Sequence, residues 1–145
     1  MKKIIGISAS RGMCIGPVFQ FFRQELVVSE KPNIQPGLEL QRLNDAFSTA
    51  KDQIENIYQK ALKESCDADA EIFQAHKMIL EDPELISEVE NKIKDLGTGA
   101  ETAVQEAGKK FSDIMAAMND EYFAARSTDI LDVTNRVLRI LLGIA

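Results

Sequence analysis

His76 is the only histidine in this chain of 145 residues, and it is the side chain best suited to acid–base or metal chemistry near neutral pH. It lies in the stretch EIFQAHKMILEDPEL, residues 71–85. A di-iron helical bundle requires Glu-x-x-His on two helices, whereas Phe73 stands three residues before His76 and the chain has no second histidine. The sequence also lacks the spacing of an EF-hand calcium loop. We therefore predict no metal site.

Other patterns that carry chemistry are missing as well. The sequence has no G-x-S-x-G nucleophile elbow, and Gly6, Gly12 and Gly16 do not have the spacing of a dinucleotide-binding turn or a P-loop. Cys14 and Cys66 belong to no C-x-x-C or Cys/His cluster, and two scattered thiols are typical of a reducing cytosol. We predict no catalytic residue and no cofactor-binding residue in this chain.

Without an active site around it, His76 has two remaining interpretations. It is either a helix residue at the edge of a core, satisfied by a polar neighbour, or part of a surface that a partner contacts. Ile72, Phe73 and Leu80 can fill a core on the same helix, which directs Met78 elsewhere. Met78 is then an adaptable contact residue or, alternatively, a filler of gaps in the core.

Arg126 poses a similar choice. It lies three residues after Phe123 and four before Ile130, on the line where an apolar helix stripe would continue. It either anchors a partner or extends its charged end to the edge of the helices. If Arg126 pairs with Asp129 or Glu121, it would instead be one member of an ordinary surface ion pair. The sequence alone does not decide between these interpretations.

Composition limits the class of protein. Hydrophobic residues make up 45% of the chain, enough for a core, and the formal net charge is −6. An acidic chain is a poor nucleic-acid binder and favours a basic protein partner. The apolar run IIGI is too short for a signal peptide, and ILLGIA falls far short of the ~20 residues that span a bilayer. We expect a cytoplasmic protein without a membrane segment.

Most of the chain has helical periodicity. Apolar residues at alternating spacings of three and four run through residues 37–65. Asp82 and Pro83 form a break at which a helix can restart, and Thr98 with Glu101 has the pattern of a capping box. The fold is thus predicted to be mainly α, an antiparallel four-helix bundle with its second helix kinked at Pro83 and helices at about 37–65, 69–96, 98–118 and 121–142.

The N-terminus differs from the rest. Residues 3–28 contain short, β-rich apolar runs separated by a turn with glycine. Two or three strands are marginal by themselves, so the segment is expected to belong to an incomplete α/β domain and the chain to be a piece of a larger protein. We predict two parts, residues 1–32 with the strands and residues 33–143 with the helices.

Three stretches of this sequence resemble one family. They are GISASRGMCIGPVF, AEIFQAHKMILEDPEL and NDEYFAARSTDILDVTNRVLRILLG, and they resemble the N-terminal region of Enzyme I, the phosphoenolpyruvate–protein phosphotransferase of bacterial sugar uptake. At residues 10–12 the chain has Ser-Arg-Gly where the family usually has Ser-Pro-Gly. The Gly-Gly-x-x-Ser-His motif that carries the family's phosphohistidine is not in this sequence.

The resemblance implies a helical domain that docks the phosphocarrier protein HPr, next to strands of a truncated phosphohistidine domain. The chain itself would then be inactive, whereas the parent would be a transferase. Carried over by position, the docking residues are Asp67, Ile72, His76, Met78, Ile79, Glu84, Leu85, Met115, Phe123 and Arg126.

The same resemblance implies no cofactor in this piece, magnesium and phosphoenolpyruvate for the full-length parent, and a parent homodimer formed through a missing C-terminal domain. Two alternatives remain open. The chain belongs to a paralogous nitrogen or dihydroxyacetone branch, or it is a stand-alone helical module that dimerises.

Overall fold

The structure is a computed structural model in which five helices account for most of the described residues. It describes residues 34–63, 67–118 and 120–144, and before them residues 5, 7, 12, 13, 15–17, 19 and 26–29. The helices are α1 (Pro36–Lys63), α2 (Asp67–Leu80), α3 (Pro83–Leu96), α4 (Ala100–Ala116) and α5 (Glu121–Leu141). The prediction of a mainly α fold is confirmed.

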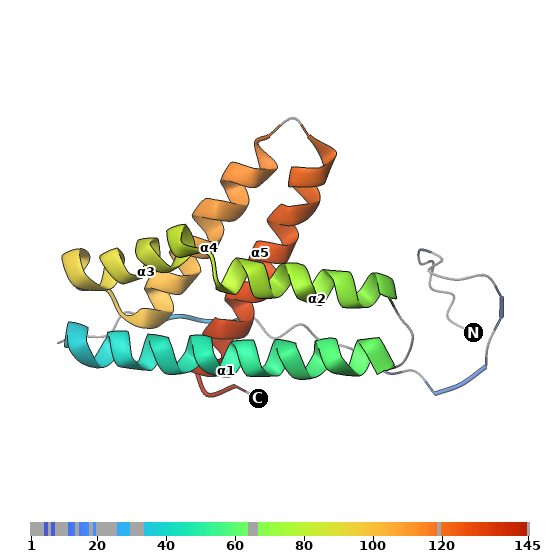
Figure 1. Ribbon diagram of the computed structural model, residues 1–145, viewed down its shortest axis with the longest axis horizontal. Coiled ribbons are helices and arrows are strands. Elements are labelled where there is room, and N and C mark those ends of the chain that lie inside the picture. The colour runs from blue at the N-terminus through green and yellow to red at the C-terminus, as the bar shows by residue number, and fades with distance from the viewer. Residues whose placement is uncertain are drawn as a thin grey trace.

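The helices form two antiparallel pairs with α3 between them. In Figure 1, α1 and α2 lie side by side, and the hairpin of α4 and α5 stands steeply across them with its closed end projecting away from α1. Helix α3 packs against α4 and α1. None of the described helices is both long and apolar enough to cross a membrane.

The predicted kinked helix is two separate helices, α2 and α3. Asp82 has an extended backbone (φ −66°, ψ 115°), and its side chain accepts a hydrogen bond of 2.8 Å from the N–H of Glu84. Pro83 occupies the first helical position, where its missing N–H costs nothing. Because the cap starts a new helix, α3 takes its own direction, and the predicted antiparallel four-helix bundle is not confirmed.

The predicted capping box at Thr98 and Glu101 is wrong. Gly99 is the N-cap of α4 and makes no side-chain cap. The hydroxyl of Thr98 donates instead to the carbonyl of Lys92, at 2.8 Å, and so closes the end of α3. Glu101 is directed toward α1.

A partly buried ionic cluster fills the role of the missing cap. Glu39 of α1 accepts a hydrogen bond of 2.8 Å from the N–H of Ala100, which satisfies the first turn of α4. The guanidinium of Arg42 pairs with Glu39 at 2.7 Å and with Glu101 at 2.5 Å, and donates to the carbonyl of Leu141 at 3.2 Å. These hydrogen bonds, above all the one to Glu101, raise the pKa of Arg42 above its ordinary value. The cluster joins α1, α4 and the end of α5.

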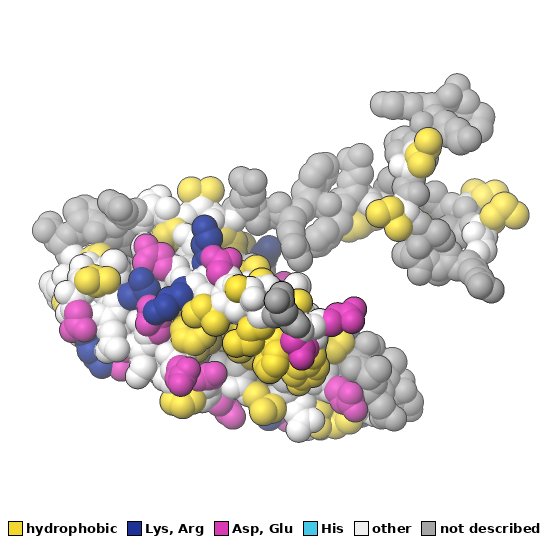
Figure 2. Space-filling view, turned by 90° about the horizontal axis from the view of Figure 1, so that it is seen from above, with side chains coloured by type: hydrophobic (Ala, Val, Ile, Leu, Met, Phe, Trp, Pro, Cys, Tyr) yellow, Lys and Arg dark blue, Asp and Glu magenta, His cyan; other side chains and the backbone are white. Residues whose placement is uncertain are grey.

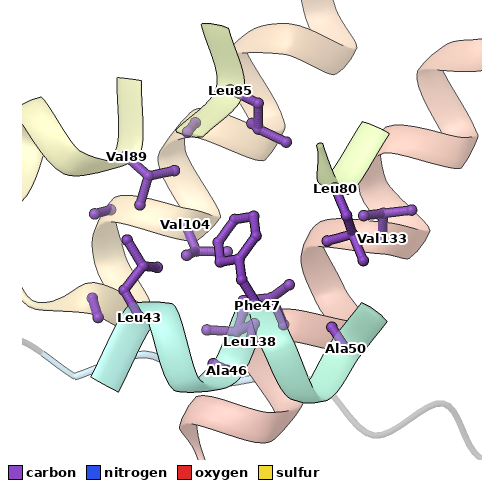
Figure 3. Packing of buried hydrophobic residues seen from close by; sticks show 14 of the residues in the cluster. Leu43, Ala46, Phe47, Ala50, Leu80, Leu85, Val89, Val104, Val133 and Leu138 are labelled. Atoms are coloured by element: carbon purple, nitrogen blue, oxygen red, sulfur yellow. The ribbon is translucent and has the colours of Figure 1, made fainter. Parts of the chain in front are cut away.

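The hydrophobic core lies where the two helix pairs meet. Phe47 of α1 points into it among residues from α3, α4 and α5 (Figure 3). Helices α4 and α5 are in tight contact at Gly108, where an added Cβ atom would lie 2.8 Å from Thr134 Cβ. Of the apolar residues spaced by three and four along the first predicted helix, Leu40 and Ile57 are partly exposed, and the others are buried, namely Leu43, Phe47, Ala50, Ile54 and Ala61.

Most of the predicted β-rich segment, residues 1–32, lies outside the described residues. The part of it that the structure describes contains no strand. Leu26 and Val28 are partly buried and pack against the helical core. The segment therefore contacts the helices at these two positions.

Candidate partner-binding groove

A groove of ≈ 700 Å³ opens between α2, α3 and the outer half of the α4–α5 hairpin. Four helices and the α2–α3 turn supply its walls, and apolar side chains predominate. Its lining residues are Ala75, Met78, Ile79, Glu81, Asp82, Pro83, Glu84, Leu85, Phe111, Met115, Tyr122, Phe123, Arg126 and Ile130.

Two capped helix starts shape the groove. The Asp82 cap turns the chain between α2 and α3 and so places acidic residues at one side. Asp120 caps α5 in the same way, accepting a hydrogen bond of 2.8 Å from the N–H of Tyr122. Because α5 begins there, Tyr122 and Phe123 lie in its first turn, at the outer end of the hairpin. Local capping rules thus position both sides of the groove.

The groove has a buried floor and an exposed apolar rim. Leu85 is 2% exposed and belongs to the core, whereas Met78 is 69% and Phe123 38% exposed. The exposed Met78 and Phe123 lie beside a concave apolar floor and so form one apolar area, the kind of surface that marks contacts between proteins. Methionine in particular adapts its shape to a partner. The arrangement suits a contact with another protein.

Acidic side chains border this apolar area. Figure 2 looks down on the ends of α4 and α5 and shows hydrophobic side chains gathered in one region with acidic groups at its edge. Glu81, Asp82 and Glu84 line the groove at the turn between α2 and α3. Glu81 lies 3.7 Å from the ammonium of Lys51, and Glu84 is exposed. The negative rim favours a partner with basic groups around an apolar centre.

Arg126 supplies the cation that lines the groove. Its guanidinium lies 3.4 Å from Asp129, donates to the Tyr122 hydroxyl at 3.0 Å, and has its central carbon 5.0 Å from the centroid of the Tyr122 ring. The two interpretations of Arg126 are therefore compatible, because it forms an ion pair with Asp129 and also faces the groove. The carboxylate that pairs with Arg126 is that of Asp129, and not that of Glu121, the other partner suggested by the sequence.

His76 lies behind the groove wall. It is 8% exposed, its ring meets Phe73 edge-on with centroids 6.0 Å apart, and its Nε2 atom is 3.5 Å from Asp129 Oδ1. Within the described part of the chain this buried nitrogen has no hydrogen-bond partner of good geometry. The side chain is thus at the edge of the core and does not line the groove.

The groove brings together seven of the ten predicted docking residues, namely Met78, Ile79, Glu84, Leu85, Met115, Phe123 and Arg126. His76 is buried, and Ile72 is exposed on α2 but does not line the groove. Asp67 begins α2, and its side chain lies outside the described part.

Sequence reasoning missed half of the lining, namely Ala75, Glu81, Asp82, Pro83, Phe111, Tyr122 and Ile130. Spacing offered a signal for several of them, including two aromatic residues. Tyr122 lies four residues before Arg126 and Phe111 four before Met115, so each shares a helix face with a predicted residue.

Among the residues that the structure describes, no three His, Cys, Asp or Glu side chains lie together as a metal site would require. The polar groups that line the groove are the guanidinium of Arg126, the phenol of Tyr122 and the acidic rim. These groups can hold a partner through charge and hydrogen bonds, around an apolar centre.

A family model and the curated relatives point to the same protein family. Residues 5–126 match the family model described as "PEP-utilising enzyme, N-terminal". The chain is 41% identical over 143 residues to a phosphoenolpyruvate-protein phosphotransferase of Priestia megaterium and 36% identical over 144 residues to one of Bacillus subtilis. Each alignment covers 99% of this chain and 25% of the relative, so the chain spans about a quarter of the length of these curated relatives.

Two solved structures have the same fold. An NMR structure of Enzyme I (nEIt) superposes with a TM-score of 0.75 at 36% identity, covering 83% of this chain and 49% of the other. The N-terminal domain of Enzyme 1 – Nitrogen superposes with a TM-score of 0.73 at 28% identity, covering 80% and 48%.

Proposed function

Because the chain belongs to the family of N-terminal domains of PEP-utilising enzymes, we propose that its groove docks the phosphocarrier protein HPr. The observation that carries this proposal is the exposed apolar groove with an acidic rim on a chain similar to Enzyme I throughout its length. Docking would bring the carrier to a phosphohistidine held elsewhere in a longer parent protein.

The groove chemistry supports a contact that forms and breaks quickly. An apolar centre with Met78 and Phe123 gives adaptable area, and the acidic rim speeds association with a basic partner. A carrier that must leave after each transfer needs fast exchange more than high affinity. Catalysis by this region would consist of holding the acceptor in place, because positioning alone removes much of the barrier to transfer.

The wider assignment follows the family. The parent would be a phosphoenolpyruvate–protein phosphotransferase of the cytoplasm that dimerises through another domain. Residues 1–32 would belong to its α/β phosphohistidine domain and residues 33–143 to the docking domain. Phosphoenolpyruvate and magnesium would act elsewhere in that parent, as the resemblance to Enzyme I implies.

Arg126→Ala should weaken HPr binding about 10- to 30-fold, a typical effect for an arginine at the centre of an interface. The melting temperature should stay nearly unchanged, because Arg126 is partly exposed and its pair with Asp129 spans a single helix turn. Isothermal titration calorimetry and thermal denaturation measure the two quantities.

The matched control for Arg126→Ala is Arg136→Ala on the same helix, whose side chain donates to Gln53 of α1 at 3.2 Å and does not line the groove. The control should bind HPr as the wild type does. Equal affinities of wild type and Arg126→Ala would leave Arg126 as a surface ion pair only.

Glu84→Gln should slow association with HPr about 2- to 5-fold at low salt, because it removes one charge from the acidic rim. The difference should shrink at high ionic strength, where screening weakens rim charges. Stopped-flow measurements at two salt concentrations test this, with Asp52→Asn, an exposed charge on α1, as control. An effect that persists at high salt would speak against electrostatic steering.

One alternative has a specific observation behind it. The similarity to the N-terminal domain of Enzyme 1 – Nitrogen supports a paralogous branch with its own carrier. Binding of the sugar-branch and nitrogen-branch carriers, measured side by side, separates the two. A dihydroxyacetone branch would bind neither of them tightly.

A helical module that dimerises through Met78, Met115 and Phe123 is a further candidate, because all three line the groove. Such a module would show an average molecular mass that rises with protein concentration in analytical ultracentrifugation. HPr docking predicts a monomer whose groove remains open to the carrier.

A further inference from the structure

A line of polar side chains runs from the core to the groove surface. It begins at the buried Nε2 of His76, passes through the two carboxylate oxygens of Asp129, and ends at the guanidinium of Arg126. We propose that Asp129 and His76 are positioning residues that fix Arg126 for docking. The inference rests on the proposed function of the groove and adds two residues that act without touching the partner.

Arg126 needs support to present one geometry. An arginine side chain loses rotamer entropy when it is fixed, and pre-organisation reduces that loss on binding. The Tyr122 hydroxyl accepts from its guanidinium at 3.0 Å, but Tyr122 is itself 61% exposed in the first turn of α5. The Tyr122 contact therefore comes from an exposed side chain, and a second contact from a less exposed residue would restrain the guanidinium further.

Asp129 is placed to give that restraint. Its carboxylate is only partly exposed and lies between two groups, with Oδ1 3.5 Å from His76 Nε2 and Oδ2 3.4 Å from Arg126 Nη1. Each oxygen therefore faces a different side chain. A carboxylate with one oxygen held on the core side can rotate less, and this fixes the direction of the other oxygen.

His76 is placed to hold the inner oxygen. Its ring is nearly buried, and Phe73 contacts it edge-on, so the imidazole is restrained by the core of α2. Its Nε2 atom has no hydrogen-bond partner of good geometry in the described part of the chain, and the Asp129 carboxylate is the acceptor beside it. Because His76 is on α2 and Asp129 on α5, the contact also ties together two walls of the groove.

A double-mutant cycle tests whether Asp129 acts through Arg126. Asp129→Asn keeps the shape of the side chain and removes its charge. It should weaken HPr binding about 3- to 10-fold in the wild-type background and less than 2-fold in the Arg126→Ala background, the signature of coupled residues. Equal effects in both backgrounds, or no effect in either, would overturn the proposal. Asp52→Asn serves as the uncoupled control.

Two substitutions of His76 test the inner contact. His76→Gln can place an amide donor near the position of Nε2, whereas His76→Phe fills the space without a donor. Gln should retain affinity within about 2-fold, and Phe should weaken binding about as much as Asp129→Asn, with both variants folded by circular dichroism. Equal affinity of the two variants would show that His76 only packs.

A measurement without partner separates failure of this inference from failure of the proposed function. The Arg126 side-chain Nε–H signal in NMR should show a restrained guanidinium in the free wild type and an averaged one in Asp129→Asn and His76→Phe. Unchanged Arg126 dynamics in both variants would refute the positioning role even if HPr binds. If HPr fails to bind the wild type while Arg126 loses its restraint in the variants, the proposed function fails and the geometric inference stands.

Discussion

Arg42→Met should lower the free energy of unfolding by about 2–4 kcal/mol. The variant leaves the buried carboxylates of Glu39 and Glu101 without the guanidinium between them. Loss of one partner from a buried ionic cluster costs more than the cluster contributes, because the remaining charge stays desolvated. The expected loss of stability is smaller than for a fully buried ion pair because the Arg42 side chain is partly exposed to solvent. Urea denaturation followed by circular dichroism measures it.

The control for Arg42→Met is Lys94→Met, which breaks an exposed pair with Glu90 on α3 and should change the stability by less than about 0.5 kcal/mol. The triple variant Arg42→Met, Glu39→Gln, Glu101→Gln should regain more than half of the lost stability, since its buried groups are neutral. A single Arg42→Met variant as stable as Lys94→Met would show that the cluster does not hold α1, α4 and α5 together.

Gly108→Ala should destabilise the protein by about 2–3 kcal/mol, against the gain of about 1 kcal/mol that alanine normally gives over glycine inside a helix. A Cβ atom there would lie 2.4 Å from Thr134 Oγ1 and 2.8 Å from Thr134 Cβ. The Thr134 hydroxyl donates to the carbonyl of Ile130 at 2.8 Å, so it cannot turn away freely. Helices α4 and α5 must therefore separate. Thermal and urea denaturation measure the loss.

Gly37→Ala is the matched control for Gly108→Ala, because Gly37 is also helical and has no atom within 4 Å of an added Cβ. It should be neutral or slightly stabilising. Adding Thr134→Ala to Gly108→Ala removes the closest contact and should restore part of the stability. A Gly108→Ala variant more stable than the wild type would mean that the two helices are not in tight contact.

Local signals in the sequence predicted the helices well. Apolar spacing located all of the helical segments. A helix was predicted to end at about residue 96, and the next residue, Gly97, has the left-handed backbone (φ 64°) of a C-terminal stop. The sequence places the break correctly at Pro83, but the prediction that one helix continues through it with a kink is wrong. A proline that follows a capping aspartate starts a new helix. The angle between α2 and α3 then depends on tertiary packing.

Tertiary contacts explain what sequence reasoning missed. The capping box failed because Glu39, some sixty residues earlier, accepts the hydrogen bond from Ala100 and leaves Glu101 to Arg42. The close approach at Gly108 depends on how α4 crosses α5, which no local pattern encodes. Most of the docking residues came from the resemblance by position, and seven of them line one groove.

His76 illustrates the same limit for the site. Its helix face was predictable from spacing, and burial at the edge of the core was one of the two interpretations. Its contact with Asp129 of α5, fifty residues later in the chain, was not predictable, because it depends on how α2 packs against α5. The role of the docking residues themselves stays a prediction until a partner is measured.

The most direct test of HPr docking is an NMR titration of the ¹⁵N-labelled chain with HPr from the same organism. The proposal predicts fast-exchange shift changes around Met78, Glu84 and Arg126, and unchanged signals at the exposed residues of α1 such as Asp52. Absence of shifts at a large excess of HPr, with the helices intact by circular dichroism, would contradict it. Shifts confined to the outer face of α1 would contradict it equally.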